Sequence, residues 1–131
     1  MILLDTHVWV WWLAQPERLS KAARQAIQRN LSAGSIGIST FSTWELALLV
    51  QRKRLQLSID LAEWIAETER IKNVTFHPVT NAIALQSVNL PGSFHPDPAD
   101  RILVATARHL GAAMITGDAK IRGYSHVKTL W

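Results

Sequence analysis

The 131-residue chain contains no cysteine. This absence excludes a disulfide framework, a thiolate metal site and a cysteine nucleophile. Long apolar runs are also missing, since the longest, residues 8–14, is far short of the roughly 20 residues of a membrane-spanning helix. The N-terminus shows no basic segment ahead of an apolar stretch, which argues against a secretory signal. We therefore expect a cytoplasmic protein with no membrane association, folded as one domain over residues 1–131.

Acidic residues are in the minority, with ten Asp and Glu against fourteen Lys and Arg, which gives a net charge of +4. Such an excess favours a polyanionic partner through phosphate contacts and counterion release. The five histidines are widely separated, and no pair has the spacing of ligands on one helix. Because cysteine is absent as well, the composition disfavours a zinc site.

Short apolar runs alternate along the chain with amphipathic segments of about ten residues. The runs that resemble strands are 2–4, 36–39, 74–79, 112–116 and 126–130, and the helical patterns are 9–14, 20–33, 41–51, 60–72, 81–88 and 98–110. This alternation predicts an α/β sandwich with a mainly parallel sheet. Pro78 places the 74–79 strand at an edge of that sheet.

Acidic residues stand at the ends of these elements. Asp5 and Asp118 directly follow strand patterns, Glu45 lies in the first turns of a helix, and Asp97 and Asp100 open the clearest helix. In parallel α/β sheets, ligands bind outside the carboxyl ends of the strands. The sequence therefore predicts that five carboxylates gather at one edge of one sheet.

Clustered carboxylates repel one another by about 4 kcal/mol per pair at 4 Å and an effective dielectric constant near 20. A hard divalent cation offsets that repulsion, and Mg²⁺ prefers oxygen ligands, including waters and substrate phosphate oxygens. The cluster thus indicates metal-assisted phosphoryl chemistry, with a nuclease and a phosphatase both open. No Gly-rich phosphate loop is present, which disfavours a nucleoside triphosphate enzyme.

Four of the five acids also have a purely structural explanation. Glu45 follows Ser42 at the spacing of a capping box. Asp97 and Asp100 suit the first turn of a helix, where acids interact favourably with its dipole. Asp118 fits an ordinary turn. Only the acid that ends the first strand lacks such an alternative.

The sequence resembles PIN-domain proteins over essentially its whole length, and specifically the VapC-like toxins of bacterial toxin–antitoxin pairs. Four segments carry the resemblance: 3–7, 39–47, 95–107 and 114–118. The third is the most specific, because it contains the string D-P-x-D-R-x-L-x-A-x-A.

This resemblance implies a three-layer α/β/α sandwich and a Mg²⁺- or Mn²⁺-dependent endoribonuclease toxin. It also implies a homodimer and a cognate antitoxin that blocks the site. By motif position, Asp5, Glu45 and Asp100 match the family's core acids, Asp118 the fourth, and Asp97 an extra acid of this subgroup. We expect Asp5 and Asp100 to bind the metal, Glu45 to act through a water, and either Asp97 or Asp118 to complete the ligands.

Two alternatives stay open beside the toxin. The first is a non-catalytic PIN-like module that binds RNA or protein, which the retention of all five acids argues against. The second is a metal-dependent nuclease or phosphatase with another phosphate substrate. Only the resemblance favours RNA over DNA.

Several neighbouring residues have two interpretations each. Thr6 and Thr116 could orient the adjacent acids, although we favour simple strand termination. Arg101 could fix a carboxylate, meet a phosphate or remain solvated. The basic run 52–54 could follow RNA backbone or bind the antitoxin, or simply be a solvated helix end.

Six tryptophans are many for a chain of this size. Trp9, Trp11 and Trp12 cannot all face inward from one short helix, so at least one should lie at a protein interface or a base-stacking surface. We expect Trp44 and Trp64 to pack in the core.

Overall fold

Five parallel strands form a single sheet in the computed structural model, which describes residues 1–131. The strands are β1 (Ile2–Leu4), β2 (Ile36–Ser39), β3 (Val74–His77), β4 (Ala113–Ile115) and β5 (Thr129–Leu130). Their order is β3-β2-β1-β4-β5, with every neighbouring pair parallel. The predicted parallel sheet is confirmed, and β3 lies at an edge as its proline indicated.

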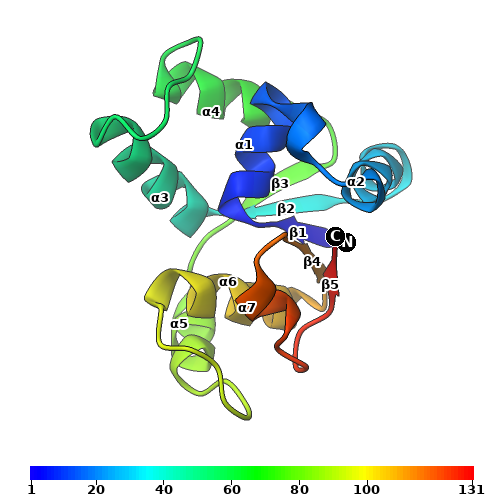
Figure 1. The fold of residues 1–131 in the computed structure, drawn as a ribbon, viewed down its shortest axis with the longest axis vertical. Helices are drawn as coiled ribbons and strands as arrows, with labels where there is room; N and C mark the ends of the chain where they lie inside the picture. The colour runs from blue at the N-terminus through cyan, green and yellow to red at the C-terminus, as the bar shows by residue number, and fades with distance from the viewer.

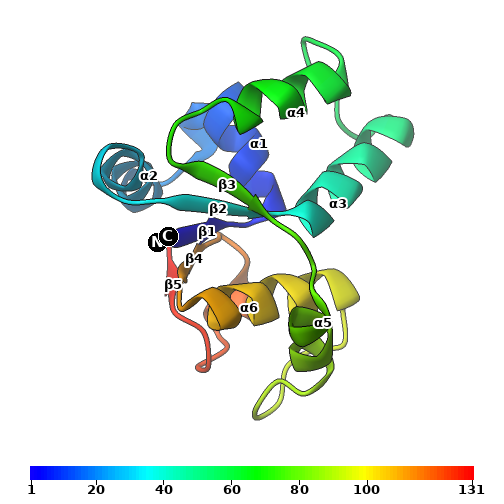
Figure 2. The ribbon, with the colours of Figure 1, turned by 180° about the vertical axis from the view of Figure 1, so that it is seen from behind.

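Helices cover both faces of this sheet. They are α1 (Thr6–Ala14), the 3₁₀ helix η1 (Pro16–Arg18), α2 (Lys21–Ala33), α3 (Thr40–Gln51), α4 (Leu61–Glu69), α5 (Asn81–Val88), α6 (Pro98–Leu110) and α7 (Ala119–Arg122). Helices α1–α4 lie on one side and α5–α7 on the other (Figures 1 and 2), which makes the predicted α/β/α sandwich. No helix is both long and apolar enough to cross a membrane.

The central strand β1 is buried on both faces. Leu4 packs in the core under α1 and α2, while Leu3 packs with Met114 in the second core under α6. In the first core, Trp9 is fully buried, 4.9 Å from Trp64 between ring centroids, and its indole N–H donates to Thr68 at 3.3 Å. Alternate residues of a strand point to opposite faces. The strand that carries the first acid is therefore held between two packed cores.

Side chains at the helix starts explain where most helices begin. Asp97 accepts from the amide of Asp100 at 3.1 Å, Pro98 occupies the first turn, and Gly111 ends α6 in the left-handed conformation at φ +63°. These features confirm the helix predicted from its proline and glycine. Ser20 and Thr80 cap α2 and α5 in the same way, as expected.

Two local predictions need correction. Helix α1 begins at Thr6 rather than Trp9, because the Asp5 carboxylate accepts from the Thr6 amide at 2.8 Å and caps the helix earlier. The short helix α7 was not predicted, since four residues are too few to show a helical period.

Candidate active site

Asp5 connects the central strand to the first helix. Its amide donates to the Ile115 carbonyl at 3.1 Å, which continues the pairing of β1 with β4. Its carboxylate accepts from the Thr116 hydroxyl at 2.7 Å and from the Thr6 amide at 2.8 Å. Burial raises the pKa of Asp5, and these two hydrogen bonds lower it. The carboxylate is thus fixed from two sides at the carboxyl edge of the sheet.

Thr116 joins two of the acids. Besides donating to Asp5, its oxygen accepts from the Asp118 amide at 3.0 Å. Asp118 then caps α7, because its Oδ1 accepts from the Lys120 amide at 2.8 Å. The turn interpretation of Asp118 is correct in local terms, yet Oδ2 has no protein donor and the residue is exposed. Capping and ligand binding are therefore compatible at this residue.

Glu45 is tied to the first helix through a hydroxyl. The Thr6 oxygen lies 2.7 Å from Glu45 Oε1 and 2.8 Å from the Ser42 oxygen. Because a hydroxyl has one proton, Thr6 donates to the carboxylate and accepts from Ser42. Burial raises the pKa of Glu45, and the Thr6 hydrogen bond lowers it. Ser39 caps α3 about a turn earlier, so the capping-box interpretation of Glu45 is wrong.

Asp100 projects from the first turn of α6, beside the capping Asp97. Burial raises the pKa of Asp100 to about 7, with a further contribution from neighbouring negative charges. In decreasing order, those charges belong to Asp97, Asp5, Asp118 and Glu45. Charges act on a pKa only over short distances, so the structure brings all five predicted acids into one electrostatic cluster, the acid cluster.

One histidine makes the only ion-pair contact with the acid cluster. His95 Nε2 lies 3.0 Å from Asp100 Oδ2, although its N–H is not aligned as a hydrogen bond. It forms the single ion pair of the structure, and only when protonated. No Lys or Arg therefore neutralises the acid cluster.

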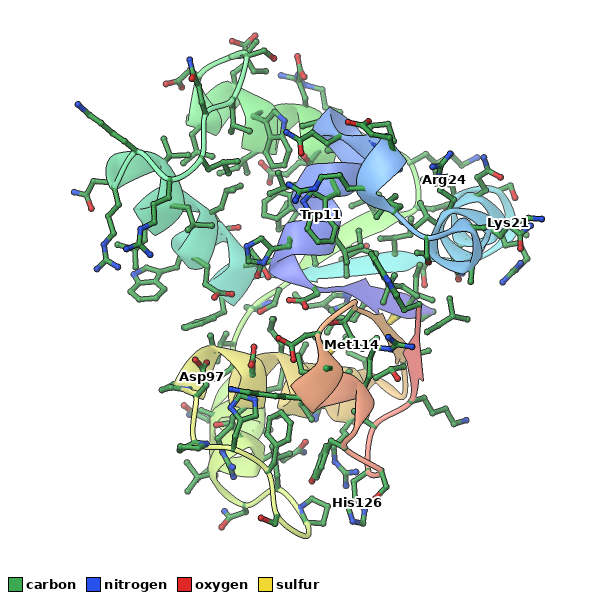
Figure 3. The ribbon with its side chains drawn as sticks, viewed as in Figure 1. Trp11, Lys21, Arg24, Asp97, Met114 and His126 are labelled. Carbon is green, nitrogen blue, oxygen red and sulfur yellow. The ribbon has the colours of Figure 1, made fainter.

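A cavity of about 280 Å³ opens beside Asp5 and Asp118. Its lining comes from α1, the turn after β4 and the C-terminal residue: Asp5, His7, Val8, Trp11, Gly117, Asp118 and Trp131. Figure 3 shows the labelled Trp11 on α1 and the labelled Asp97 at the start of α6, on opposite sides of the sheet. The acid cluster is thus open to a ligand.

The donor set suits a hard cation. All five acids offer oxygen only, and Glu45, Asp97, Asp100 and Asp118 each keep one oxygen without a protein donor. No three Asp, Glu or His side chains converge on one point as a finished ligand set. Uncompensated carboxylates repel one another, which is consistent with their being close without converging. Their chemistry therefore fits Mg²⁺ or Mn²⁺, with waters and substrate oxygens as the remaining ligands.

The structure corrects three interpretations of neighbouring residues. Thr6 and Thr116 are not mere strand terminators, since both hydroxyls donate to acids of the cluster. Their position directly beside a strand-end acid was the available signal. Arg101 meets no carboxylate and is half-buried, and its guanidinium donates to the carbonyls of Ser87, Phe94 and Val88, which fixes the loop before α6.

The predictions for the tryptophans are confirmed in part. Trp9 and Trp64 are buried, whereas Trp44 is 55% exposed on α3, contrary to the core packing expected for it. Trp11 and Trp12 are half-buried, so the prediction that the three tryptophans of α1 cannot all face inward is confirmed.

Comparisons with known proteins agree with this architecture. The sequence matches the PIN domain family over residues 2–127. It is 39% identical over 133 aligned residues to Ribonuclease VapC22 of Mycobacterium tuberculosis, covering 99% of this chain and 98% of the relative.

Solved structures with the same fold include VapBC2 from Rickettsia felis bound to a promoter DNA fragment, with a TM-score of 0.70, 13% identity and coverage of 98% and 97% of the two chains. A toxin–antitoxin complex from Klebsiella pneumoniae has a TM-score of 0.65, 19% identity and coverage of 97% and 95%. The sarcin-ricin loop cleaving toxin VapC20 of Mycobacterium tuberculosis has a TM-score of 0.62, 18% identity and coverage of 98% and 99%.

Proposed function

The chain belongs to the PIN-domain family, and from this premise we propose that it is a Mg²⁺-dependent endoribonuclease that acts as the toxin of a toxin–antitoxin pair. The observation that carries the proposal is the acid cluster, in which no carboxylate has a Lys or Arg partner and in which burial, together with the neighbouring negative charges, raises the pKa of Asp100 to about 7. A structural role requires no such repulsion, whereas a divalent cation relieves it.

The residues divide into those that bind and those that position. Asp5, Asp100, Glu45 and Asp118 would hold the cation, Glu45 through a water. A bound divalent cation supplies an acidified water and charge stabilisation at the phosphoryl group. Asp97 fixes the first turn of α6 and adds negative charge to the cluster.

Two hydroxyls hold the acids in place. Thr116 donates to Asp5 and accepts from the Asp118 amide, so it sets the relative placement of acids from β1 and β4. The Thr6 hydroxyl donates to Glu45 and so fixes this acid of α3 relative to α1. Such partners orient ligands and restrict their motion.

RNA is the proposed substrate because the relative of 39% identity is named a ribonuclease and the chain is basic. A cognate antitoxin is the proposed partner, because structures with this fold are of toxin–antitoxin complexes. A homodimer and a cytoplasmic location complete the proposal. Manganese could replace magnesium, since both accept carboxylate and water oxygens.

Cleavage of single-stranded and structured RNA tests the activity. We expect cleavage in Mg²⁺, loss in EDTA, recovery on adding excess Mg²⁺ or Mn²⁺, and loss in the Asp5→Asn variant. Asp60→Asn is the matched control, because Asp60 is an exposed cap of α4 outside the cluster and asparagine retains the cap. Cleavage that persists in EDTA or in Asp5→Asn would overturn the metal mechanism, and RNA binding without cleavage would identify a non-catalytic module.

The toxin role has a separate test. Expression of the wild-type chain should arrest growth, Asp5→Asn should not, and co-expression of the antitoxin should restore growth. Cleavage in vitro without growth arrest would leave a nuclease that is not a toxin.

A further inference from the structure

A second cavity adjoins the acid cluster. It has a volume of about 610 Å³ and lies between α1, η1 and the loop that follows α3. Its lining is His7, Val10, Trp11, Gln15, Arg18, Leu49, Arg54, Leu55 and Gln56, and we call it the basic groove. His7 and Trp11 also line the cavity at the acids. The two cavities therefore meet at these two rings.

Two uncompensated guanidinium groups give the groove its charge. Arg18 and Arg54 are exposed, and neither has a carboxylate within 4 Å, since the single ion pair of the structure involves His95. Arg18 Cζ lies 5.0 Å from the centre of the Trp11 ring, and its Nη1 donates to the Gln15 amide oxygen at 3.3 Å. The ring and the amide orient this guanidinium while leaving most of its five donors free.

We propose that the basic groove binds the backbone of the RNA strand on one side of the scissile bond, where Arg18 and Arg54 contact phosphates. His7 and Trp11 form the junction between the groove and the cavity at the acids. This inference rests on the proposed ribonuclease function. The acid cluster repels an approaching phosphate chain, so the strand needs cationic contacts close to the cut but outside the acids. The basic groove places them there.

The lining favours a nucleic acid strand over an acidic peptide. Guanidinium groups match phosphates and carboxylates alike with paired donors, so the rest of the lining decides between the two. Aromatic rings at the junction offer faces to bases or riboses, a feature typical of single-strand binding surfaces. His7 and Trp11 are 5.9 Å apart between ring centroids, and Trp131 lies at the same distance from Trp11 on the acid side. An aromatic path thus leads from the groove to the acids.

The test compares two pairs of arginine substitutions in an Asp100→Asn background, which blocks cleavage and removes one repelling charge. The probe is a fluorescent single-stranded RNA of about 12 nucleotides, titrated in Mg²⁺ at several salt concentrations. We expect Arg18→Gln/Arg54→Gln to weaken binding by about 10-fold near 0.1 M salt. The slope of log K against log salt should become shallower by about 1.4, because each lost phosphate contact removes about 0.7 for a single strand.

Arg24→Gln/Arg29→Gln is the matched control. Both arginines are exposed on α2 and outside the groove. Figure 3 shows Arg24 on α2, whereas Trp11 of the groove lies on α1. This pair removes the same net charge, and we expect less than about a twofold change in binding, with the slope unchanged within error. Equal losses in the two pairs would overturn the proposal, since net charge alone would then explain the binding.

Two further outcomes separate the alternatives. If the groove pair leaves RNA binding unchanged but abolishes binding of an oligoglutamate peptide, the groove binds an acidic protein segment and the proposal fails. If wild-type protein cleaves RNA in Mg²⁺ while the groove pair behaves as the control, this inference fails and the ribonuclease function stands. If RNA binding responds as expected but no Mg²⁺-dependent cleavage occurs, the ribonuclease function fails and the groove assignment stands.

Discussion

The acid cluster and the basic groove share the rings of His7 and Trp11 but are built in opposite ways. The carboxylates of Asp5 and Glu45 are held by hydroxyls from neighbouring elements, and burial raises the pKa of both. The guanidinium groups of the groove are exposed at the ends of elements. One region is organised for a fixed arrangement of charge, and the other for contact with a mobile chain.

This difference indicates that the acid cluster and the basic groove have separate roles in catalysis and in substrate binding. Electrostatic catalysis depends on groups that are already in place, whereas phosphate binding by solvated cations tolerates motion. Substitutions in the acid cluster should therefore change kcat, and substitutions in the groove should change KM and its salt dependence.

Asp100→Asn should lower RNA cleavage by about 10³-fold, since several kcal/mol of charge stabilisation depend on the metal ligands. The same substitution should stabilise the metal-free protein at pH 8. The pKa of Asp100 is about 7 in the fold, so its ionisation there opposes folding. We expect a gain on the order of 2 kcal/mol after allowance for partial exposure, or about 7 °C in Tm.

Differential scanning calorimetry in EDTA and a cleavage assay in Mg²⁺ measure the two effects on the same protein. Asp60→Asn again serves as the control, with neither effect. Loss of activity accompanied by loss of stability would show that Asp100 is a structural residue, and the contrast between the two regions would disappear.

Thr116→Val should lower kcat by about 10- to 100-fold with little change in KM. Valine keeps the shape and burial of the side chain but removes the hydroxyl that donates to Asp5 and accepts from the Asp118 amide. The control is Thr75→Val, which removes an exposed hydroxyl from the edge strand β3. Single-turnover kinetics separate the two constants, and rescue by Thr116→Ser would assign the effect to the hydroxyl. A change confined to KM would contradict the assignment of Thr116 as a positioning residue.

The metal-free protein should lose stability as pH rises from about 4 to about 7. Asp100 has a raised pKa in the fold, so its protonated form is favoured there, and the resulting stability disappears as pH passes through the folded value near 7. Asp5 and Glu45 act in the same direction. Burial lowers the pKa of His77, which opposes the trend, because the fold favours its neutral ring and loses stability as pH falls.

The difference in Tm between wild type and Asp100→Asn isolates the acid, because His77 contributes equally to both proteins. That difference should grow between pH 4 and pH 7 and shrink when Mg²⁺ is added at pH 8. A difference independent of both pH and Mg²⁺ would show that the acid cluster carries no uncompensated charge.

Local signals explain which parts of the fold were predictable. Helix α6 could be placed because its cap, its proline and its final glycine all lie within the segment itself. The capping box predicted at Glu45 was wrong because Ser39, which lies outside the expected helix, is the N-cap of α3. The burial of Trp64 and the exposure of Trp44 depend on how α3 and α4 pack on the sheet, which neither helix shows on its own.

The acid cluster was predictable for a different reason. Parallel strands place their carboxyl ends at one edge, and helices that follow a strand or point at that edge begin there, so an acid just after a strand or in the first turns of such a helix can be located from its position alone. The hydroxyl partners depend on contacts between segments far apart in the sequence, such as Asp5 and Thr116 at a separation of 111 positions, and the fixation of Arg101 depends on how the loop before α6 folds back. No spacing rule covers such contacts.

Trp11→Leu should give the smallest effect, a rise in KM of about three- to fivefold with kcat unchanged. The ring orients Arg18 by a cation–π contact at 5.0 Å, worth about 0.5–1 kcal/mol at an exposed site. Trp44→Leu is the matched control, because Trp44 is more exposed but lines neither cavity. Steady-state cleavage at low and high salt measures the difference, and the loss in Trp11→Leu should fade at high salt, where the phosphate contacts of Arg18 are screened. A larger effect at Trp44 would show that RNA binds along the exposed face of α3 rather than in the groove. A fall in kcat in Trp11→Leu would show that Trp11 supports the acid cluster as well as the groove.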